Sequence, residues 1–114
     1  MELQIQKEIK SGIAIIHLQG EVDLYSSTEV RKEIMGLTRA KLPGILVDLQ
    51  YVKYMDSSGV ATLIEGLQQT NKYKGRFVLS GLQSNVREVF ELTRLDKVFE
   101  IHADVNEALE CMKT

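Results

Sequence analysis

Cysteine and long apolar runs are the two features that this chain of 114 residues has least of. A lone cysteine, Cys111, excludes an internal disulfide and a metal cage built from cysteines. The longest apolar runs extend over a few residues, whereas a membrane-spanning helix needs about 20. No charged-then-apolar leader opens the chain either. We therefore expect a cytoplasmic protein with no membrane partner.

The chain also lacks an excess of basic residues. It carries 14 Lys and Arg against 16 Asp and Glu, a formal net charge of −2, and these residues are spread along the sequence. Nucleic-acid-binding domains usually show a basic patch or stripe, so nucleic acid is not an expected partner. There is no glycine-rich phosphate-binding loop, because Gly75 and Gly81 are isolated. We expect neither a nucleotide enzyme nor a cofactor.

What is present is the composition of an ordinary globular protein, 44% hydrophobic and 26% charged. A chain of this length can bury one core without cross-links. No linker, internal repeat or low-complexity segment divides it. Residues 1–114 are therefore expected to form a single domain.

The N-terminal region predicts two paired strands. Residues 3–9 alternate between apolar and polar side chains, which is typical of a half-buried strand. Ser11 and Gly12 form a short connection to a second strand at residues 13–19. So short a link predicts an antiparallel hairpin. In the second strand, even-numbered residues 14–18 share one face and odd-numbered residues 13–17 share the other.

After the hairpin, helical and extended patterns alternate. Apolar residues recur at spacings of three and four in the helical segments, and short apolar runs mark the strands. Right-handed crossovers then predict an α/β fold, namely a mixed, mostly parallel sheet with an N-terminal antiparallel hairpin, packed by about four helices. The expected order is a helix at 26–42, a strand from 45 that closes at 48–49 and leads on to residue 55, a helix up to 74, a strand at 77–79, a helix from 84, a strand at 98–101 and a helix from 104.

Three of the predicted helix starts carry candidate capping residues. Ser26 with Glu29 fits a capping box, Ser84 fits a simple cap, and Asp104 with Glu107 fits a second box-like cap.

The fourth helix start, at residues 55–59 (Met-Asp-Ser-Ser-Gly), is the most informative stretch of the chain. It follows a predicted parallel strand, and sites in such folds lie at the C-terminal ends of strands. The positive end of the helix dipole and its unpaired N–H groups tolerate added negative charge there. A serine hydroxyl in this position can be a cap, a nucleophile or a phosphorylation site.

On these residues alone, a helix cap without chemistry is the simpler interpretation. However, one serine suffices as a cap, so the second hydroxyl is surplus, and no Glu or Gln stands three residues after either serine. A nucleophilic Ser57 or Ser58 would need a nearby base. The two histidines, His17 and His102, lie far from the motif in sequence, and no Gly-x-Ser-x-Gly elbow exists.

Other polar residues have simpler interpretations. His17 and His102 fit strand-surface positions and lack metal-ligand spacing, so no metal site is expected. Asp48, at the end of an apolar run, fits turn chemistry better than catalysis. Tyr51 and Tyr54 fit either half-buried packing or contacts at a protein interface.

The chain as a whole resembles the anti-sigma factor antagonists, which are members of the STAS domain group. The resemblance covers nearly the entire sequence and is carried by residues 20–23 (Gly-Glu-Val-Asp), residues 47–59 with the Asp-Ser-Ser-Gly element, and residues 89–95. It implies a monomeric STAS domain without enzymatic activity. Such a protein binds an anti-sigma factor, often itself a serine kinase, and so frees a sigma factor.

The resemblance also assigns roles to particular residues. It implies phosphorylation by the kinase at the second serine, Ser58, with Ser57 as the alternative. Phosphorylation would end binding, and a serine phosphatase would restore it. Asp23 would lie beside the phosphorylation loop. The expected partner-binding residues are Asp23, Asp56, Ser57, Ser58 and Gly59.

Two departures from the family pattern bear on the choice of partner. Val60-Ala61 stands where Leu-Gly is common in the family, and Arg94 stands where a glycine often follows the residue matching Thr93. Both leave the phosphorylation site intact. The alternative function is a constitutive scaffold subunit of a stress-signalling or transporter-associated complex, in which the serines only cap the helix. The sequence does not identify the sigma factor or the signal.

Overall fold

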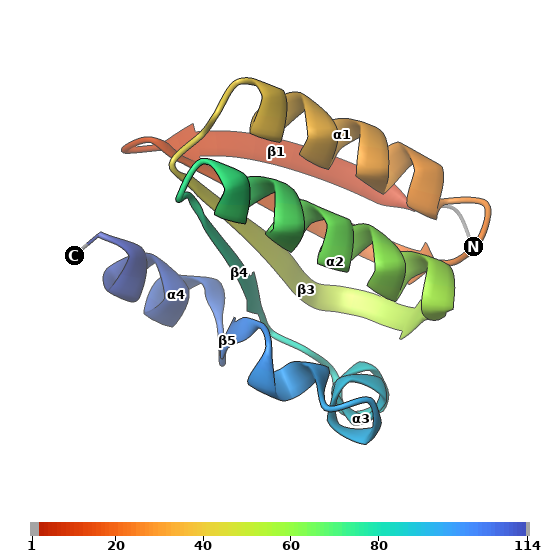
Figure 1. Cartoon of the computed structure of the whole chain (residues 1–114). Coiled ribbons are helices and arrows are strands. Elements are labelled where there is room, and N and C mark those ends of the chain that lie inside the picture. The colour runs from red at the N-terminus through yellow and green to blue at the C-terminus, as the bar shows by residue number, and fades with distance from the viewer. Residues whose placement is uncertain (1–2, 114) are drawn as a thin grey trace.

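The computed structural model describes residues 3–113. Five strands form one sheet in the order β1-β2-β3-β4-β5, and four helices pack on its two faces (Figure 1). The elements are β1 (Gln4–Lys10), β2 (Ile13–Val22), α1 (Ser27–Arg39), β3 (Gly44–Met55), α2 (Ser57–Lys72), β4 (Arg76–Ser80), α3 (Ser84–Leu92), a 3-10 turn (Leu95–Lys97), β5 (Glu100–His102) and α4 (Val105–Met112).

The predicted N-terminal hairpin is confirmed. β1 and β2 pair antiparallel, with Lys10 opposite Ile13 at the closed end. The two turn residues, Ser11 and Gly12, have φ values of 53° and 80°. Positive φ at both central positions is the turn geometry that matches the twist of paired strands. The pairs β2–β3, β3–β4 and β4–β5 are parallel, as predicted.

The strand order explains where the helices lie. Each parallel strand follows its neighbour in sequence, and right-handed crossovers that all step in one direction place their helices on the same face. α1, α2 and α3 therefore share one face, where α1 and α2 run side by side (Figure 1). α4 follows the last strand and covers part of the opposite face. The rest of that second face, over β1 and β2, is left polar.

Two apolar clusters fill the two layers, and the predicted alternation in β2 is confirmed. Ala14, Ile16 and Leu18 belong to the larger cluster beneath α1, α2 and α3. Ile13 and Ile15 belong to the smaller cluster beneath α4. The completely buried side chains of the larger cluster include Ile34, Leu63 and Phe90, one from each covering helix.

The predicted capping box at Ser26 and Glu29 is wrong. Ser26 makes no side-chain capping bond to α1. Its Oγ instead donates to the carbonyl oxygen of Glu21 (2.7 Å) and accepts from the N–H of Asp23 (2.9 Å). The carboxylate of Asp23 holds the turn before α1, since its Oδ1 accepts the N–H groups of Tyr25 and Ser26, each at 2.9 Å. Asp23 thus accepts the Ser26 N–H that a capping box would have given to the Glu29 side chain.

Of the other two predicted caps, the one at Ser84 is wrong and the one at Asp104 is confirmed. Ser84 is the first residue of α3 and not its cap, and Gln83 before it makes no capping bond either. Asp104 does cap α4, because its Oδ1 accepts the N–H of Glu107 at 2.8 Å. Glu107 in turn accepts the N–H of Ala103 at 3.0 Å. Within residues 3–113, no helix combines the length and the apolar character that crossing a membrane requires.

Candidate functional site

The N-terminus of α2 is capped by Asp56, and neither adjacent serine is the cap. Asp56 has an extended backbone, and its Oδ1 accepts the N–H of Ser58 at 2.9 Å and the N–H of Gly59 at 3.2 Å. This is the usual arrangement in which a short acidic side chain satisfies the first free N–H groups of a helix. One serine was expected to serve as the cap, whereas Asp56 takes that role and neither hydroxyl caps the helix.

Asp56 also ties the start of α2 to the loop that follows β2. Its second carboxylate oxygen, Oδ2, accepts the N–H of Leu24 at 3.1 Å, and its own N–H donates to the carbonyl oxygen of Val22 at 3.1 Å. Asp23 lies in that loop, where hydrogen bonds from the backbone N–H groups of Ser26 and Tyr25 hold its pKa below the usual range. The structure therefore places the loop that contains Asp23 beside the start of α2, and a partner-binding role of these two acids stays a prediction.

The two serines present free hydroxyls at this helix end. Ser57 is exposed and Ser58 is half-buried. Neither hydroxyl forms a hydrogen bond with another group of residues 3–113, although the Ser58 carbonyl accepts from Thr62 Oγ1 at 3.0 Å. The backbone of Ser58 is thus held by hydrogen bonds at its N–H and its carbonyl group, whereas its hydroxyl takes part in no hydrogen bond within residues 3–113.

Gly59 is required by a close approach. A Cβ at this position would lie 2.7 Å from Met55 Cγ, 2.8 Å from Val22 Cγ1 and 2.9 Å from the Val22 carbonyl oxygen. Real Cβ atoms do not approach other atoms so closely, so only glycine lets α2 start directly against the ends of β2 and β3. This close packing is what the structure shows for Gly59, and its expected role in partner binding stays a prediction.

A groove of about 500 Å³ opens beside Ser57, between α2 and α3. Its surface is mainly apolar. The exposed Ala61 and the half-buried Ile64 come from the outer side of α2, whereas Val89 and Thr93 come from α3. Its remaining lining residues are Tyr54, Met55, Asp56, Ser57 and Val60.

The contribution of α3 to this groove was not predicted from the sequence. By their spacing of three and four, Val86, Val89 and Phe90 would be expected on the inner face of that helix. The structure buries Val86 and Phe90, four residues apart, and leaves Val89 only half-buried at the edge of the stripe. A valine at the edge of an apolar stripe was the signal that could have revealed it.

The two histidines lie away from the serines, each between two carboxylates on the face of the sheet that α4 partly covers. His17 Nδ1 lies 2.7 Å from Asp48 Oδ2, and its Nε2 lies 2.7 Å from Glu8 Oε2. His102 contacts Glu100 at 2.8 Å and Glu107 at 3.1 Å. Within residues 3–113, neither histidine bonds to Ser57 or Ser58, so these serines have no histidine base.

These contacts change the proton affinity of both histidines. Partial burial opposes the charge of His17, but the hydrogen bonds to Asp48 and Glu8 outweigh that cost and raise its pKa. The hydrogen bond to Glu100 raises the pKa of His102. The two contacts of His17 join β2 to β1 and β3, whereas those of His102 reach Glu100 in its own strand and Glu107 in the first turn of α4.

The structure also shows the surroundings of Asp48, Tyr51 and Tyr54. Asp48 is not at a strand end, because β3 continues to Met55, and its side chain is buried. The expected strand end and turn at Asp48 are therefore wrong, although its Oδ1 accepts the N–H of Gln50 at 3.0 Å, beside an irregularity in the β2–β3 register. Tyr54 borders the groove between α2 and α3, whereas Tyr51 borders a shallow pocket on the polar face of β1 and β2.

Comparison with known proteins gives a consistent result. The sequence model of the STAS domain matches residues 4–108. The chain is 27% identical over 110 residues to the anti-sigma F factor antagonist of Paenibacillus polymyxa, covering 96% of this chain and 94% of the relative. It is 32% identical over 103 residues to the anti-sigma-B factor antagonist of Listeria monocytogenes, covering 89% of this chain and 90% of the relative.

A solved structure shows the same fold. The Bacillus cell fate determinant SpoIIAA, in its phosphorylated form, matches with a TM-score of 0.77 and 24% identity, over 94% of this chain and 97% of that one. The chain therefore belongs to the STAS domain family. Within that family it groups with the anti-sigma factor antagonists, which are regulatory proteins without enzymatic activity and which interact with anti-sigma factors.

Proposed function

We propose that this protein, when unphosphorylated, binds an anti-sigma factor that is also a serine kinase, and so releases a sigma factor. Phosphorylation of Ser58 ends the binding, and a serine phosphatase restores it. The observation that carries the proposal is the cap made by Asp56, because it leaves the Ser58 hydroxyl unused at the start of a 16-residue helix. The protein acts in this way as a monomer in the cytoplasm.

The site can accept a phosphate without unfolding. A phosphoserine adds about −1.5 to −2 charges at neutral pH. The positive end of the α2 dipole offsets part of that charge, by about 0.3–1 kcal/mol. The phosphorylated structure of SpoIIAA, which has this fold, supports the same conclusion. We therefore expect phosphorylation to leave the domain folded.

Within an interface the same phosphate is strongly unfavourable. At about 5 Å from an acidic group of the partner, and with an effective dielectric constant near 20, each unit charge pair costs about 3 kcal/mol. Desolvating the phosphate adds to this cost. Since a thousandfold loss of affinity needs only about 4 kcal/mol, one phosphate can empty the interface.

The docking surface follows from the position of Ser58. It comprises residues 56–59, the loop that holds Asp23, and the groove between α2 and α3 that begins beside Ser57. Apolar side chains of the anti-sigma factor would enter this groove, where Ala61 and Ile64 are accessible. A phosphate on Ser58 would then stand at the edge of the contact.

Phosphate mapping after incubation with an anti-sigma factor kinase tests the assignment. The wild type, Ser57→Ala and Ser58→Ala would be incubated with kinase and ATP, digested and analysed by mass spectrometry. We expect one phosphate on the wild type and on Ser57→Ala, and none on Ser58→Ala. A phosphate on Ser57 would move the switch by one residue. No phosphate on any variant would favour a constitutive scaffold subunit and contradict the proposal.

A further inference from the structure

A second surface of the molecule lies along β1, the strand at one edge of the sheet. β1 is the outermost strand, paired with β2 on one side and with no strand of residues 3–113 on the other. An edge strand presents a row of free backbone N–H and C=O groups. An extended chain can therefore pair with this side of the sheet.

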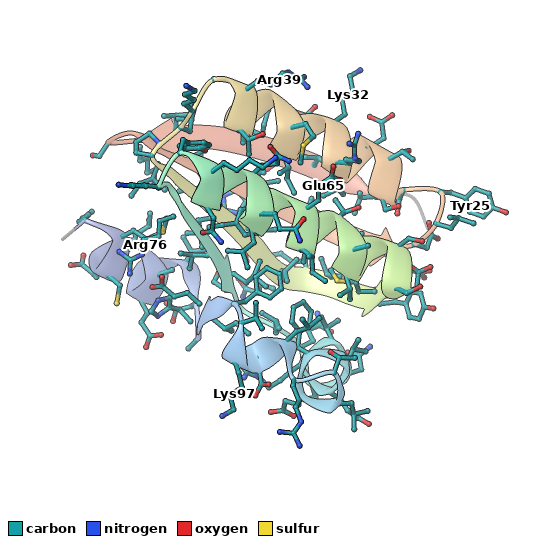
Figure 2. The ribbon with its side chains drawn as sticks, viewed as in Figure 1. Tyr25, Lys32, Arg39, Glu65, Arg76 and Lys97 are labelled. Atoms are coloured by element: carbon teal, nitrogen blue, oxygen red, sulfur yellow. The ribbon has the colours of Figure 1, made fainter. Side chains whose placement is uncertain are left out.

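A groove of about 730 Å³ runs along this edge, between β1 and α1. Its floor is formed by Leu3, Ile5 and Lys7, and the first two are half-buried and pack on the larger apolar cluster. Its wall is α1. Tyr25 stands at one end, 84% exposed, and projects from the loop before α1 away from the body of the molecule (Figure 2). The groove shares no lining residue with the groove between α2 and α3.

The charges around the groove select its occupant. Three acidic residues, Asp23, Glu29 and Glu33, line it against one base, Lys7, so its formal charge is −2. Lys7 Nζ lies 2.6 Å from Glu33 Oε1 and neutralises one acid. The Asp23 carboxylate is occupied by its own loop. An apolar floor with a net negative wall fits a segment that combines apolar and basic side chains.

We propose that this groove binds an extended basic segment of a partner protein, which adds to the sheet beside β1. Glu29 and Glu33 lie one helical turn apart, about 6 Å along the axis of α1. Alternate residues of a strand lie about 6.6 Å apart and point to the same side. Two Lys or Arg residues separated by one residue can therefore reach both glutamates, while the side chains between them face away from α1.

A second copy of this chain is a poorer occupant. Pairing of two β1 edges would bring two grooves of the same negative charge together, and like charges at an interface oppose association. The proposal therefore commits to a basic partner segment. It does not depend on Ser58. The two surfaces share the loop that holds Asp23, but the tested residues Glu29 and Glu33 lie outside the surface proposed for the anti-sigma factor, so the two proposals can fail separately.

A peptide titration on the whole chain tests the inference. The ligand is a blocked nine-residue peptide in which lysine alternates with valine or threonine, and the observable is the amide spectrum of the ¹⁵N-labelled protein. We expect shifts confined to β1, the loop at 23–26 and α1. Affinity should fall about threefold in Glu29→Gln and about tenfold or more in the double variant Glu29→Gln/Glu33→Gln.

Two controls make the result specific. Glu110→Gln, which neutralises an exposed acid on α4, should bind the peptide as the wild type does. A peptide with glutamate in place of lysine should not bind. Equal affinity for the double variant, shifts on other elements, or absence of binding would each overturn the proposal. So would a dimer in sedimentation that dissociates in Glu29→Gln, because a second copy would then fill the groove.

Discussion

Replacing Asp56 by alanine should destabilise the protein more than the same change at Asp104, the cap of α4. Both side chains accept N–H groups at a helix start, and loss of such a cap costs about 1 kcal/mol. Asp104 accepts one backbone N–H, that of Glu107. Asp56 accepts three, from Ser58, Gly59 and, across 32 residues of sequence, Leu24.

The difference between the two variants follows from the additional bond. A hydrogen bond to a charged acceptor contributes about 1.5–3 kcal/mol, and the exposure of Leu24 places this one at the lower end. We expect the free energy of unfolding to fall by about 2–3 kcal/mol in Asp56→Ala and by about 1 kcal/mol in Asp104→Ala. Asp56→Asn keeps one carbonyl oxygen as an acceptor, so its loss of unfolding free energy should lie between those of Asp56→Ala and Asp104→Ala.

Urea unfolding followed by far-ultraviolet circular dichroism measures these differences, since the chain has no tryptophan for fluorescence. The slopes of the transitions should agree among the variants, which shows that only stability has changed. If Asp56→Ala lost no more stability than Asp104→Ala, the bond to Leu24 would contribute nothing, and the link between the two loops of the site would have to be abandoned.

Three further predictions concern glycine, pH and a buried hydroxyl. Gly59→Ala should cost about 1–3 kcal/mol by overpacking, whereas Gly36→Ala, with no atom within 4 Å of the added Cβ, should gain about 0.5–1 kcal/mol; equal effects in urea unfolding would disprove the close approach. The raised pKa values of His17 and His102 give stability that is complete below their unfolded pKa of about 6.5 and lost as pH rises through the folded values. The urea concentration at the unfolding midpoint should therefore be lower at pH 8 than at pH 6. Substitution of both histidines by asparagine should reduce this difference. Ser80→Ala should leave stability unchanged or higher, because the buried Ser80 Oγ has no hydrogen-bond partner within residues 3–113; a loss above about 1 kcal/mol would reveal a missing partner.

Features set by neighbouring residues could be predicted from the sequence. The hairpin follows from a two-residue turn, and the two faces of β2 follow from alternation, because both depend on contacts within a few residues. The helix start at residues 56–59 was predicted for the same reason. The capping box at Ser26 was wrong because Asp23, only three residues away, accepts the Ser26 N–H that the box would have given to the Glu29 side chain.

Features set by distant residues could not be predicted. The bond between Leu24 and Asp56, the position of His17 beside Asp48, and the edge valine of α3 in the groove, Val89, depend on which strands become neighbours. Periodicity within a segment contains no information on strand order. The assignment of Ser58, by contrast, came from resemblance to a family and remains a prediction.

Calorimetric binding of the anti-sigma factor to four proteins tests the central claim most directly. These are the wild type, Ser58→Ala, Ser58→Asp and the control Ser84→Asp, which adds the same charge at the exposed start of α3. We expect Ser58→Ala and Ser84→Asp to bind like the wild type and Ser58→Asp to bind at least 100-fold more weakly, a change of about 3 kcal/mol, with an unchanged circular dichroism spectrum. Wild-type affinity in Ser58→Asp would contradict the account.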